Sequence, residues 1–226
     1  MTAETGWERA RVAGLIDHTL LAPTATRSDV ARLCAEAIAR GFRGVCVAGS
    51  HLADAVKQLE GSQVKPITVV GFPLGHSTIY AKLFEALEGL RLGAEELDVV
   101  INISRLKSGD ARAVESEMRE IMAKTPECDH KFIVELALLE PAELLRVCKI
   151  ANKLKPAYIK TATGFLAGPT TAEQVARLRS ELDPRVAIKA AGGLKTWDDV
   201  RAVLEAGAAI VGTSSGVAIL DQLPMD

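Results

Sequence analysis

Two lysines stand in the middle of stretches that are otherwise typical of buried β-strands: Lys160 in AYIKT (residues 157–161) and Lys189 in VAIKA (residues 186–190). Lysine is rarely buried without a partner, and both burial and a neighbouring positive charge favour the neutral amine. The neutral amine is the nucleophile that forms Schiff bases with carbonyl compounds. We therefore predict that one lysine forms an imine with a carbonyl substrate and that the other lowers its pKa. The pattern leaves open which lysine is the nucleophile, and for either one alone a pairing with a buried acid such as Asp98 or Glu135 is the alternative.

Acidic side chains lie in other predicted strands. Asp98 belongs to ELDVVIN (residues 96–102), where the alternation of a strand places it on the same face as Asn102. An acid in this position is suited to moving protons through a water molecule while it balances the lysines, or to acting only as their counter-ion. Asp17 is suited equally to bonding a substrate hydroxyl and to positioning its neighbours, and we expect Glu135 to be a structural partner of a lysine.

The elements that must position these residues are short apolar strands that alternate with helical patterns. A capping box opens one helix at Thr196 and Asp199, and Gly41, Gly93 and Gly207 lie where left-handed C-caps are expected. Eight strand–helix units indicate a parallel sheet, and eight is the number that closes into a (β/α)8 TIM barrel. The predicted strands are residues 15–20, 43–47, 67–71, 97–102, 132–136, 157–161, 186–190 and 209–212.

This α/β barrel is expected to be a single domain over residues 1–226, because no linker, charge block or change in composition divides the chain. An open, doubly wound sheet is the competing fold, but its phosphate-binding glycines usually follow the first strand, where this chain has LAPT (residues 21–24). In a barrel, catalytic side chains project from the carboxyl ends of the strands. The polar strand residues are therefore expected to converge at one mouth.

Two glycine-bearing turns follow the seventh and eighth predicted strands, where TIM barrels often hold phosphate. Glycine lets backbone N–H groups approach an anion closely, and a helix N-terminus adds its positive end. Turn chemistry alone explains one such turn, but two at these places predict a phosphorylated small substrate. The residues concerned are Gly192, Gly193, Gly212, Ser214 and Ser215.

Composition and charge exclude several classes of function. The 226 residues are 48% hydrophobic and 25% charged with a formal net charge of −2, so we expect a globular protein without the basic surface that nucleic acid or a membrane would require. No apolar run suits a membrane span and residues 1–12 lack a signal-peptide core, so a cytoplasmic location is expected. Four cysteines and four histidines lack metal-site spacing, so no metal, no cofactor and no disulfide is predicted.

Two further features are expected to be structural. Cys46 ends the second predicted strand and is expected to fill the core, since no histidine is placed in sequence to activate it. Lys82 and Glu85 are three residues apart in a helical segment, and we expect them to form a solvated pair on its surface.

Six motifs in order resemble those of the deoxyribose-phosphate aldolase family, and the resemblance runs from about Leu15 to Leu220. They are LIDHTLL (15–21), VGFPLG (70–75), ELDVVINI (96–103), IKTATGF (159–165), IKAAGG (188–193) and GTSSG (212–216).

The resemblance implies a metal-free class I aldolase that reversibly cleaves 2-deoxy-D-ribose 5-phosphate to acetaldehyde and D-glyceraldehyde 3-phosphate. Lys160 matches the family's Schiff-base lysine, Lys189 the second lysine and Asp98 the acid of the proton relay. Asp17 matches a residue lining the sugar site, and we place Thr163 and Gly164 with it in the substrate site. The phosphate loops match at Gly192, Gly193, Ser214 and Ser215. We expect a homo-oligomer, either a dimer or a tetramer.

The chain departs from related short-form enzymes in two places. Pro169 stands in the loop after Lys160, where it removes one backbone donor near the phosphate. The chain has tyrosines only at Tyr80 and Tyr158, so it lacks the C-terminal tyrosine that closes the site in some members. Two alternatives stay open: a barrel aldolase or epimerase acting on another phosphosugar, and a non-catalytic barrel that binds a phosphorylated metabolite.

Overall fold

Eight parallel strands form a closed barrel in the order of the chain, which confirms the predicted fold. The computed structural model describes residues 7–166 and 168–224, so residues 1–6, Ala167 and the last two residues of the predicted single domain lie outside the described residues. Every predicted strand overlaps an observed one. The strands are β1 Ile16–Leu20, β2 Gly44–Val47, β3 Lys65–Val70, β4 Glu96–Val100, β5 Asp129–Ile133, β6 Tyr158–Lys160, β7 Ala187–Ala191 and β8 Ile210–Thr213.

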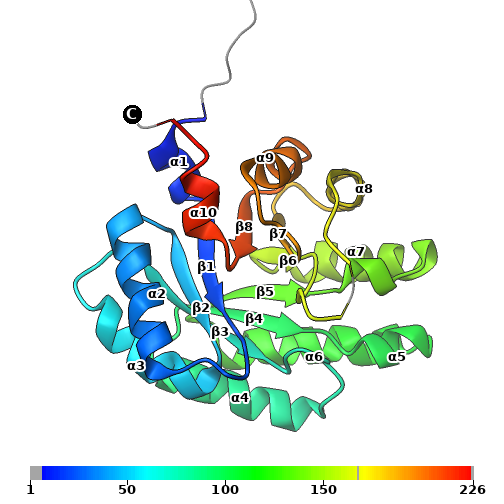
Figure 1. Cartoon of the computed structure of the whole chain (residues 1–226). Helices are drawn as coiled ribbons and strands as arrows, with labels where there is room; N and C mark the ends of the chain where they lie inside the picture. Colours follow the sequence, from blue (N-terminus) through cyan, green and yellow to red (C-terminus); the bar gives the residue numbers. More distant parts are fainter. Residues whose placement is uncertain (1–6, 167, 225–226) are drawn as a thin grey trace, which may run out of the picture.

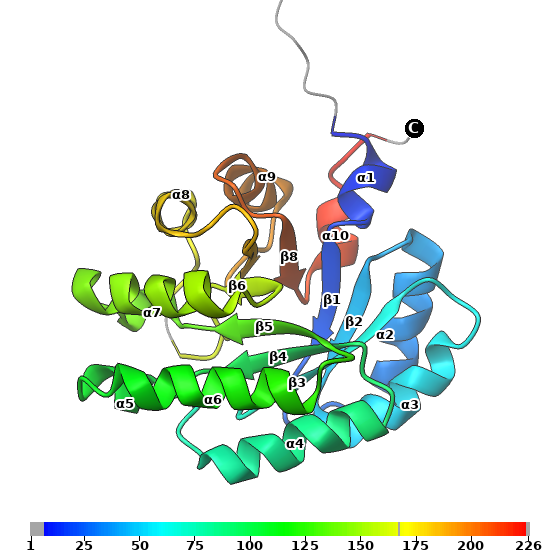
Figure 2. The same cartoon turned by 180° about the vertical axis from the view of Figure 1, so that it is seen from behind.

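Helices surround this barrel, and Figures 1 and 2 show them from two sides. The capping box at Thr196 and Asp199 is present. Gly41, Gly93 and Gly207 all have positive φ at the ends of helices, as predicted. The helices are α1 Arg9–Ala13, α2 Arg27–Arg40, α3 Gly49–Leu59, α4 Ile79–Arg91, α5 Ile103–Lys107, α6 Ala111–Lys124, the 3-10 turn η1 Leu136–Leu138, α7 Pro141–Leu154, α8 Ala172–Glu181, α9 Trp197–Glu205 and α10 Gly216–Leu220.

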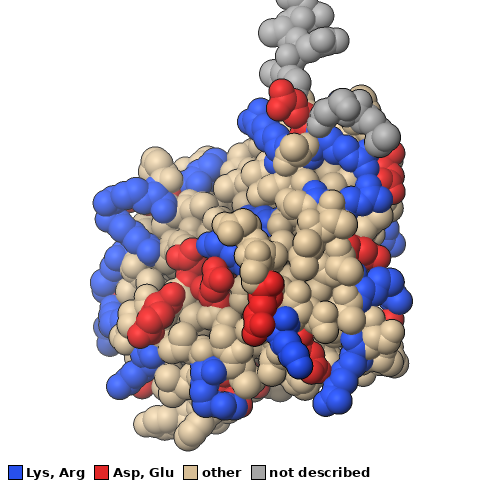
Figure 3. All heavy atoms as spheres, turned by 90° about the vertical axis from the view of Figure 1, so that its left-hand side faces the viewer, with Lys and Arg blue, Asp and Glu red and all other residues tan. Residues whose placement is uncertain are grey.

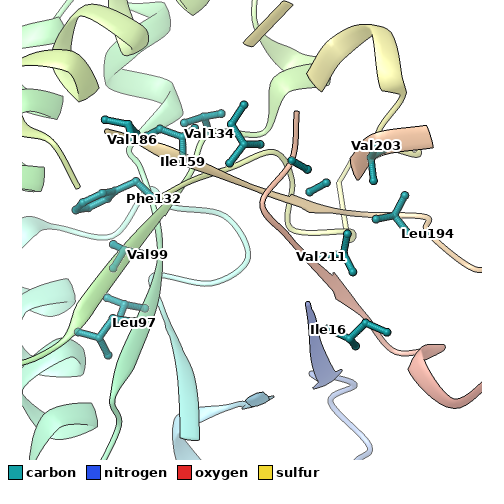
Figure 4. Packing of buried hydrophobic residues seen from close by; sticks show 14 of the residues in the cluster. Ile16, Leu97, Val99, Phe132, Val134, Ile159, Val186, Leu194, Val203 and Val211 are labelled. Carbon is teal, nitrogen blue, oxygen red and sulfur yellow. The ribbon is translucent and has the colours of Figure 1, made fainter. Parts of the chain in front are cut away.

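The apolar core lies between the strands and the helices. Outward-facing strand residues such as Leu97, Val99 and Phe132 are fully buried there (Figure 4). Because successive strand residues point to opposite faces, the residues between them point into the barrel. Several of those inward residues are charged, so this barrel has an apolar outer layer and an ionic interior.

The structure corrects two predicted strand ends. β5 ends at Ile133, so Glu135 lies outside the strand and precedes η1 with a positive φ of 51°. Its carboxylate accepts from the backbone N–H and the hydroxyl of Thr163 (3.0 and 2.6 Å) rather than from a lysine. β4 ends at Val100, and Asn102 caps α5 by accepting from the backbone N–H of Arg105, so it does not continue the inner face of Asp98.

The prediction of a solvated Lys82–Glu85 pair is wrong. Lys82 lies on the buried face of α4. Its ammonium donates to Glu117 of α6 (2.9 Å) and to the carbonyl of Val100 at the end of β4 (2.7 Å). Glu85 instead accepts from the backbone N–H of Gly71. The spacing of Lys82 and Glu85 on α4 could not reveal this, because their partners come from other elements of the chain.

Charges of both signs share the face shown in Figure 3. None of the helices in residues 7–166 and 168–224 is both long enough and apolar enough to span a membrane.

Candidate active site

Lys160 and Lys189 are direct neighbours across β6 and β7, where the strand register pairs them. Both side-chain nitrogens donate to the same carboxylate oxygen, Oδ2 of Asp98, at 2.7 and 2.8 Å. The two nitrogens therefore lie within two hydrogen-bond lengths of each other. The structure thus brings together the three residues that the sequence singled out for catalysis.

These residues belong to a larger ionic cluster inside the barrel. Lys131 of β5 donates to Oδ1 of Asp98 (2.9 Å) and forms an ion pair with Glu96 at 2.5 Å. Asp17 of β1 forms an ion pair with Lys189 at 2.6 Å. All the carboxylates and lysines of this cluster are 0 to 2% exposed.

Arg43, which precedes β2, is the last member of this cluster and contacts two of its carboxylates. Its guanidinium donates to Asp17 (2.8 Å) and, through both terminal nitrogens, to Glu96 (2.9 and 2.5 Å). The ring of Tyr158 lies 5.6 Å from the guanidinium carbon. We call the cluster formed by Asp17, Arg43, Glu96, Asp98, Lys131, Lys160 and Lys189 the barrel charge cluster.

The carboxyl groups of the cluster are ionised. Burial alone would raise the pKa of Asp17, Glu96 and Asp98, but the surrounding cations outweigh burial and hold each pKa below its usual value. For Glu96 the result is a pKa of about 2, chiefly because of Arg43 and Lys131.

A Glu96→Gln variant tests this effect through stability in acid. The depressed pKa of Glu96 stabilises the native state above the usual glutamate value of 4.5, and the contribution is lost as the pH falls toward about 2. We expect the wild type to lose up to about 3 kcal/mol of its unfolding free energy through this residue over that range. Urea unfolding at several acidic pH values should show a shallower pH dependence for the variant, and equal slopes would contradict the assignment.

Lys189 matches the second lysine of the family, the one expected to lower the pKa of the nucleophile. Burial alone would lower the pKa of Lys189, but Asp17 and Asp98 outweigh burial and raise it above its usual range. Lys189 is therefore protonated in the free protein. Of the two lysines, Lys160 has the single acceptor Asp98, whereas Lys189 has two carboxylate partners. Lys160 is thus the less strongly paired of the two lysines.

A cavity with a volume of about 340 Å³ opens above the cluster at the carboxyl ends of β1, β6, β7 and β8. Lys160 lines it, whereas Asp98 and Lys189 lie beneath it and are completely buried. Asp17 is equally buried, so it contacts Lys189 and Arg43 rather than the cavity. The other predicted residues at the cavity wall are Thr163, Gly164, Gly192, Gly193, Gly212 and Ser214.

The glycines of the cavity wall also make room for neighbouring groups. A Cβ on Gly212 would lie 2.9 Å from the Cε of Lys189, so a larger residue there would displace the end of the lysine side chain. Gly193 has a φ of 73°, and a Cβ there would lie 2.5 Å from the ring of Pro169. Pro169, which departs from the family pattern, therefore packs on the predicted phosphate loop. Ser215 is outside the cavity lining, and its backbone N–H donates to Thr213.

Several residues of the site escaped the sequence analysis. The cavity wall includes the apolar segment from Leu20 to Pro23 and the cationic Lys195, which follows the predicted phosphate glycines. Among the side chains that the structure describes, none forms an ion pair with Lys195. A cation that has no ion-pair partner among the described side chains and lies next to two glycine turns suits an anionic group of a ligand.

Comparisons with known proteins agree for sequence and for fold. The family model described as DeoC/LacD family aldolase matches residues 11–222. A deoxyribose-phosphate aldolase of Streptococcus pneumoniae is 43% identical over 205 residues, which are 91% of this chain and 93% of the relative. One of Geobacillus sp. is 41% identical over 211 residues, 93% and 95% of the two chains. A tetrameric deoxyribose phosphate aldolase of Aeropyrum pernix has a TM-score of 0.88 at 34% identity, covering 95% of this chain and 92% of that one.

Proposed function

This chain belongs to the DeoC/LacD family of aldolases, and on that premise we propose that it reversibly cleaves 2-deoxy-D-ribose 5-phosphate to acetaldehyde and D-glyceraldehyde 3-phosphate through an imine at Lys160. The observation that carries the assignment of the nucleophile is the position of Lys160. It is the one lysine of the barrel charge cluster that lines the cavity, and it shares its only carboxylate partner with Lys189.

In this mechanism the neutral amine of Lys160 attacks the aldehyde carbon of the open-chain sugar and water leaves, which gives a protonated imine. The imine accepts the electron pair of the neighbouring carbon–carbon bond when the sugar's C3 hydroxyl loses its proton, so glyceraldehyde 3-phosphate departs. The enamine that remains is protonated on carbon, and hydrolysis releases acetaldehyde. Asp98, Lys189 and a water molecule carry these protons. Lys131 balances the charge of the Asp98 carboxylate during these steps.

Direct assay of the purified protein on a panel of sugar phosphates tests the proposed reaction. We expect cleavage of 2-deoxy-D-ribose 5-phosphate, with acetaldehyde and glyceraldehyde 3-phosphate formed in equal amounts. Preferred cleavage or epimerisation of another phosphosugar would favour the alternative of an aldolase or epimerase that acts on that sugar. Ligand-induced thermal stabilisation without turnover and without imine capture would favour a non-catalytic binding barrel.

We propose that Lys195 and the two glycine turns hold the phosphate of the substrate. A Lys195→Gln variant should raise KM for the phosphorylated sugar about tenfold, since a charge-assisted contact is lost. It should leave KM for unphosphorylated 2-deoxyribose unchanged, which makes that sugar the internal control. An equal change in KM for both sugars, or none for either, would place the phosphate elsewhere.

We also propose that the chain forms a homo-oligomer, a dimer or a tetramer, through α4. Tyr80, Phe84 and Leu87 are 71%, 76% and 42% exposed and share one helical face. Phe84→Glu should at least halve the mass measured by light scattering, because it puts a charge into an apolar contact. Glu88→Gln on the same helix is the control. A wild type that is monomeric, or a Phe84→Glu variant of unchanged mass, would refute this surface.

A further inference from the structure

The numbers of positive and negative groups in the barrel charge cluster are unequal. Its three carboxylates are Asp17, Glu96 and Asp98, whereas its cationic groups are Lys131, Lys160, Lys189 and Arg43. Without Arg43, three lysines would balance three carboxylates, and every lysine could keep its proton. With Arg43, the cluster has one cationic group in surplus.

Arg43 cannot relieve that surplus itself. A guanidinium does not lose its proton in proteins, and the carboxylates of Asp17 and Glu96 raise the pKa of Arg43 further, even though burial opposes them. Its side chain is only 13% exposed, so solvent screens its charge poorly. Lys65 also contacts Glu96, but its side chain is 37% exposed and lies 4.0 Å from Asp129, so we count it with the solvated charges.

The groups around Lys160 indicate which lysine loses a proton. Lys131 lies between Asp98 and Glu96, and Lys189 lies between Asp98 and Asp17. Lys160 pairs with only one carboxylate oxygen, Oδ2 of Asp98, and Lys189 pairs with the same oxygen. The charged and titratable groups that face Lys160 are Asp98 of β4, Lys189 of β7 and the thiol of Cys46 in β2, and Lys195 lines the same cavity.

We propose that Arg43 sets the protonation of the nucleophile: its permanent charge, at the end of the cluster remote from the cavity, makes Lys160 release a proton so that the buried charges balance. Arg43 does not line the cavity and acts only through the other charges of the cluster. The inference rests on the proposed imine at Lys160. It goes beyond that function by naming the residue that prepares the neutral amine before the substrate arrives.

The proposal predicts the sign of the change for three variants. Arg43→Met removes the surplus, so loss of a proton from Lys160 would leave a net negative cluster, and imine formation should require a higher pH. Glu96→Gln enlarges the surplus, so imine formation should occur at a lower pH. The double variant Arg43→Met/Glu96→Gln again has one surplus cationic group, and its pH dependence should return to that of the wild type.

The test measures how fast cyanoborohydride fixes acetaldehyde on Lys160 at a series of pH values from mildly acidic to mildly alkaline. We expect the midpoint of the rate profile to move up by about one pH unit in Arg43→Met and down by a similar amount in Glu96→Gln, as expected for one poorly screened unit charge. Arg91→Met is the matched control, because Arg91 is 68% exposed and pairs with Glu88 at the surface. Its midpoint should not move.

The fold is expected to survive in each variant because every carboxylate of the cluster keeps a partner. Without Arg43, Asp17 still pairs with Lys189, and Glu96 still pairs with Lys131 and Lys65. If Arg43→Met nevertheless fails to fold, the downward shift in Glu96→Gln tests the same charge count. An unmoved midpoint in Arg43→Met or Glu96→Gln, or a double variant that keeps the shift of Arg43→Met, overturns the proposal. Absence of any adduct in the wild type would instead refute the proposed function.

Discussion

Lys160→Ala should lose both aldehyde capture and sugar-phosphate cleavage, with kcat/KM lowered roughly 10⁴-fold or more. Alanine removes the only amine of the barrel charge cluster that reaches the cavity, and the remaining lysines lie beneath its floor. We expect Lys195, the other lysine of the cavity wall, not to replace Lys160 as the nucleophile, because we propose that Lys195 binds the phosphate. The measurement is steady-state cleavage of 2-deoxy-D-ribose 5-phosphate, combined with mass analysis after cyanoborohydride treatment.

The same variant should keep its fold. After the substitution, Arg43, Lys131 and Lys189 face Asp17, Glu96 and Asp98, so the buried charges are equal in number. The urea midpoint is therefore expected to be unchanged or slightly higher than in the wild type. A folded Lys160→Ala protein that still captures acetaldehyde, or that keeps a tenth of the wild-type rate, would place the nucleophile elsewhere.

Asp98→Asn should impair both activity and stability. Asp98 accepts from Lys131, Lys160 and Lys189, and its replacement leaves two carboxylates to balance four cationic groups. Removing one partner from a buried ion pair typically costs about 3–5 kcal/mol, so the free energy of unfolding should fall by about that much. Activity should fall by roughly 10³-fold, because the proposed acid of the proton relay is lost as well.

Asp54→Asn provides the matched control for this loss of stability. Asp54 pairs with Arg27 on the surface, and an exposed pair is worth about 1 kcal/mol or less. Urea unfolding near neutral pH and the cleavage assay check both effects of Asp98→Asn together. If Asp98→Asn were as stable and as active as Asp54→Asn, Asp98 would neither balance the buried lysines nor take part in the reaction.

The fold could be predicted because the inner and outer faces of the strands alternate and because glycines and capping residues mark the ends of helices. Lys160 and Lys189 were recognisable for a related reason: the same apolar pattern surrounds both, and neighbouring strands then place them side by side. Asp98 followed from the same alternation. These are local features, which sequence patterns report well.

The partners of these residues were harder to predict because they come from strand ends. Glu96 and Lys131 precede the predicted starts of their strands, although alternation from Asp98 back to Glu96 could have found the first of them. Arg43 lies next to β2, and only closure of the barrel places it beside Glu96.

Mapping the acetaldehyde adduct in the wild-type protein tests the central claim most directly. The protein is treated with acetaldehyde and cyanoborohydride and digested, and the modified peptide is sequenced by mass spectrometry. We predict a single ethyl group on the side chain of Lys160, in the peptide that includes Thr161 and Thr163. An adduct on Lys189 or Lys131, or no adduct in a protein that still cleaves the sugar phosphate, would contradict the claim that Lys160 is the neutral, imine-forming amine.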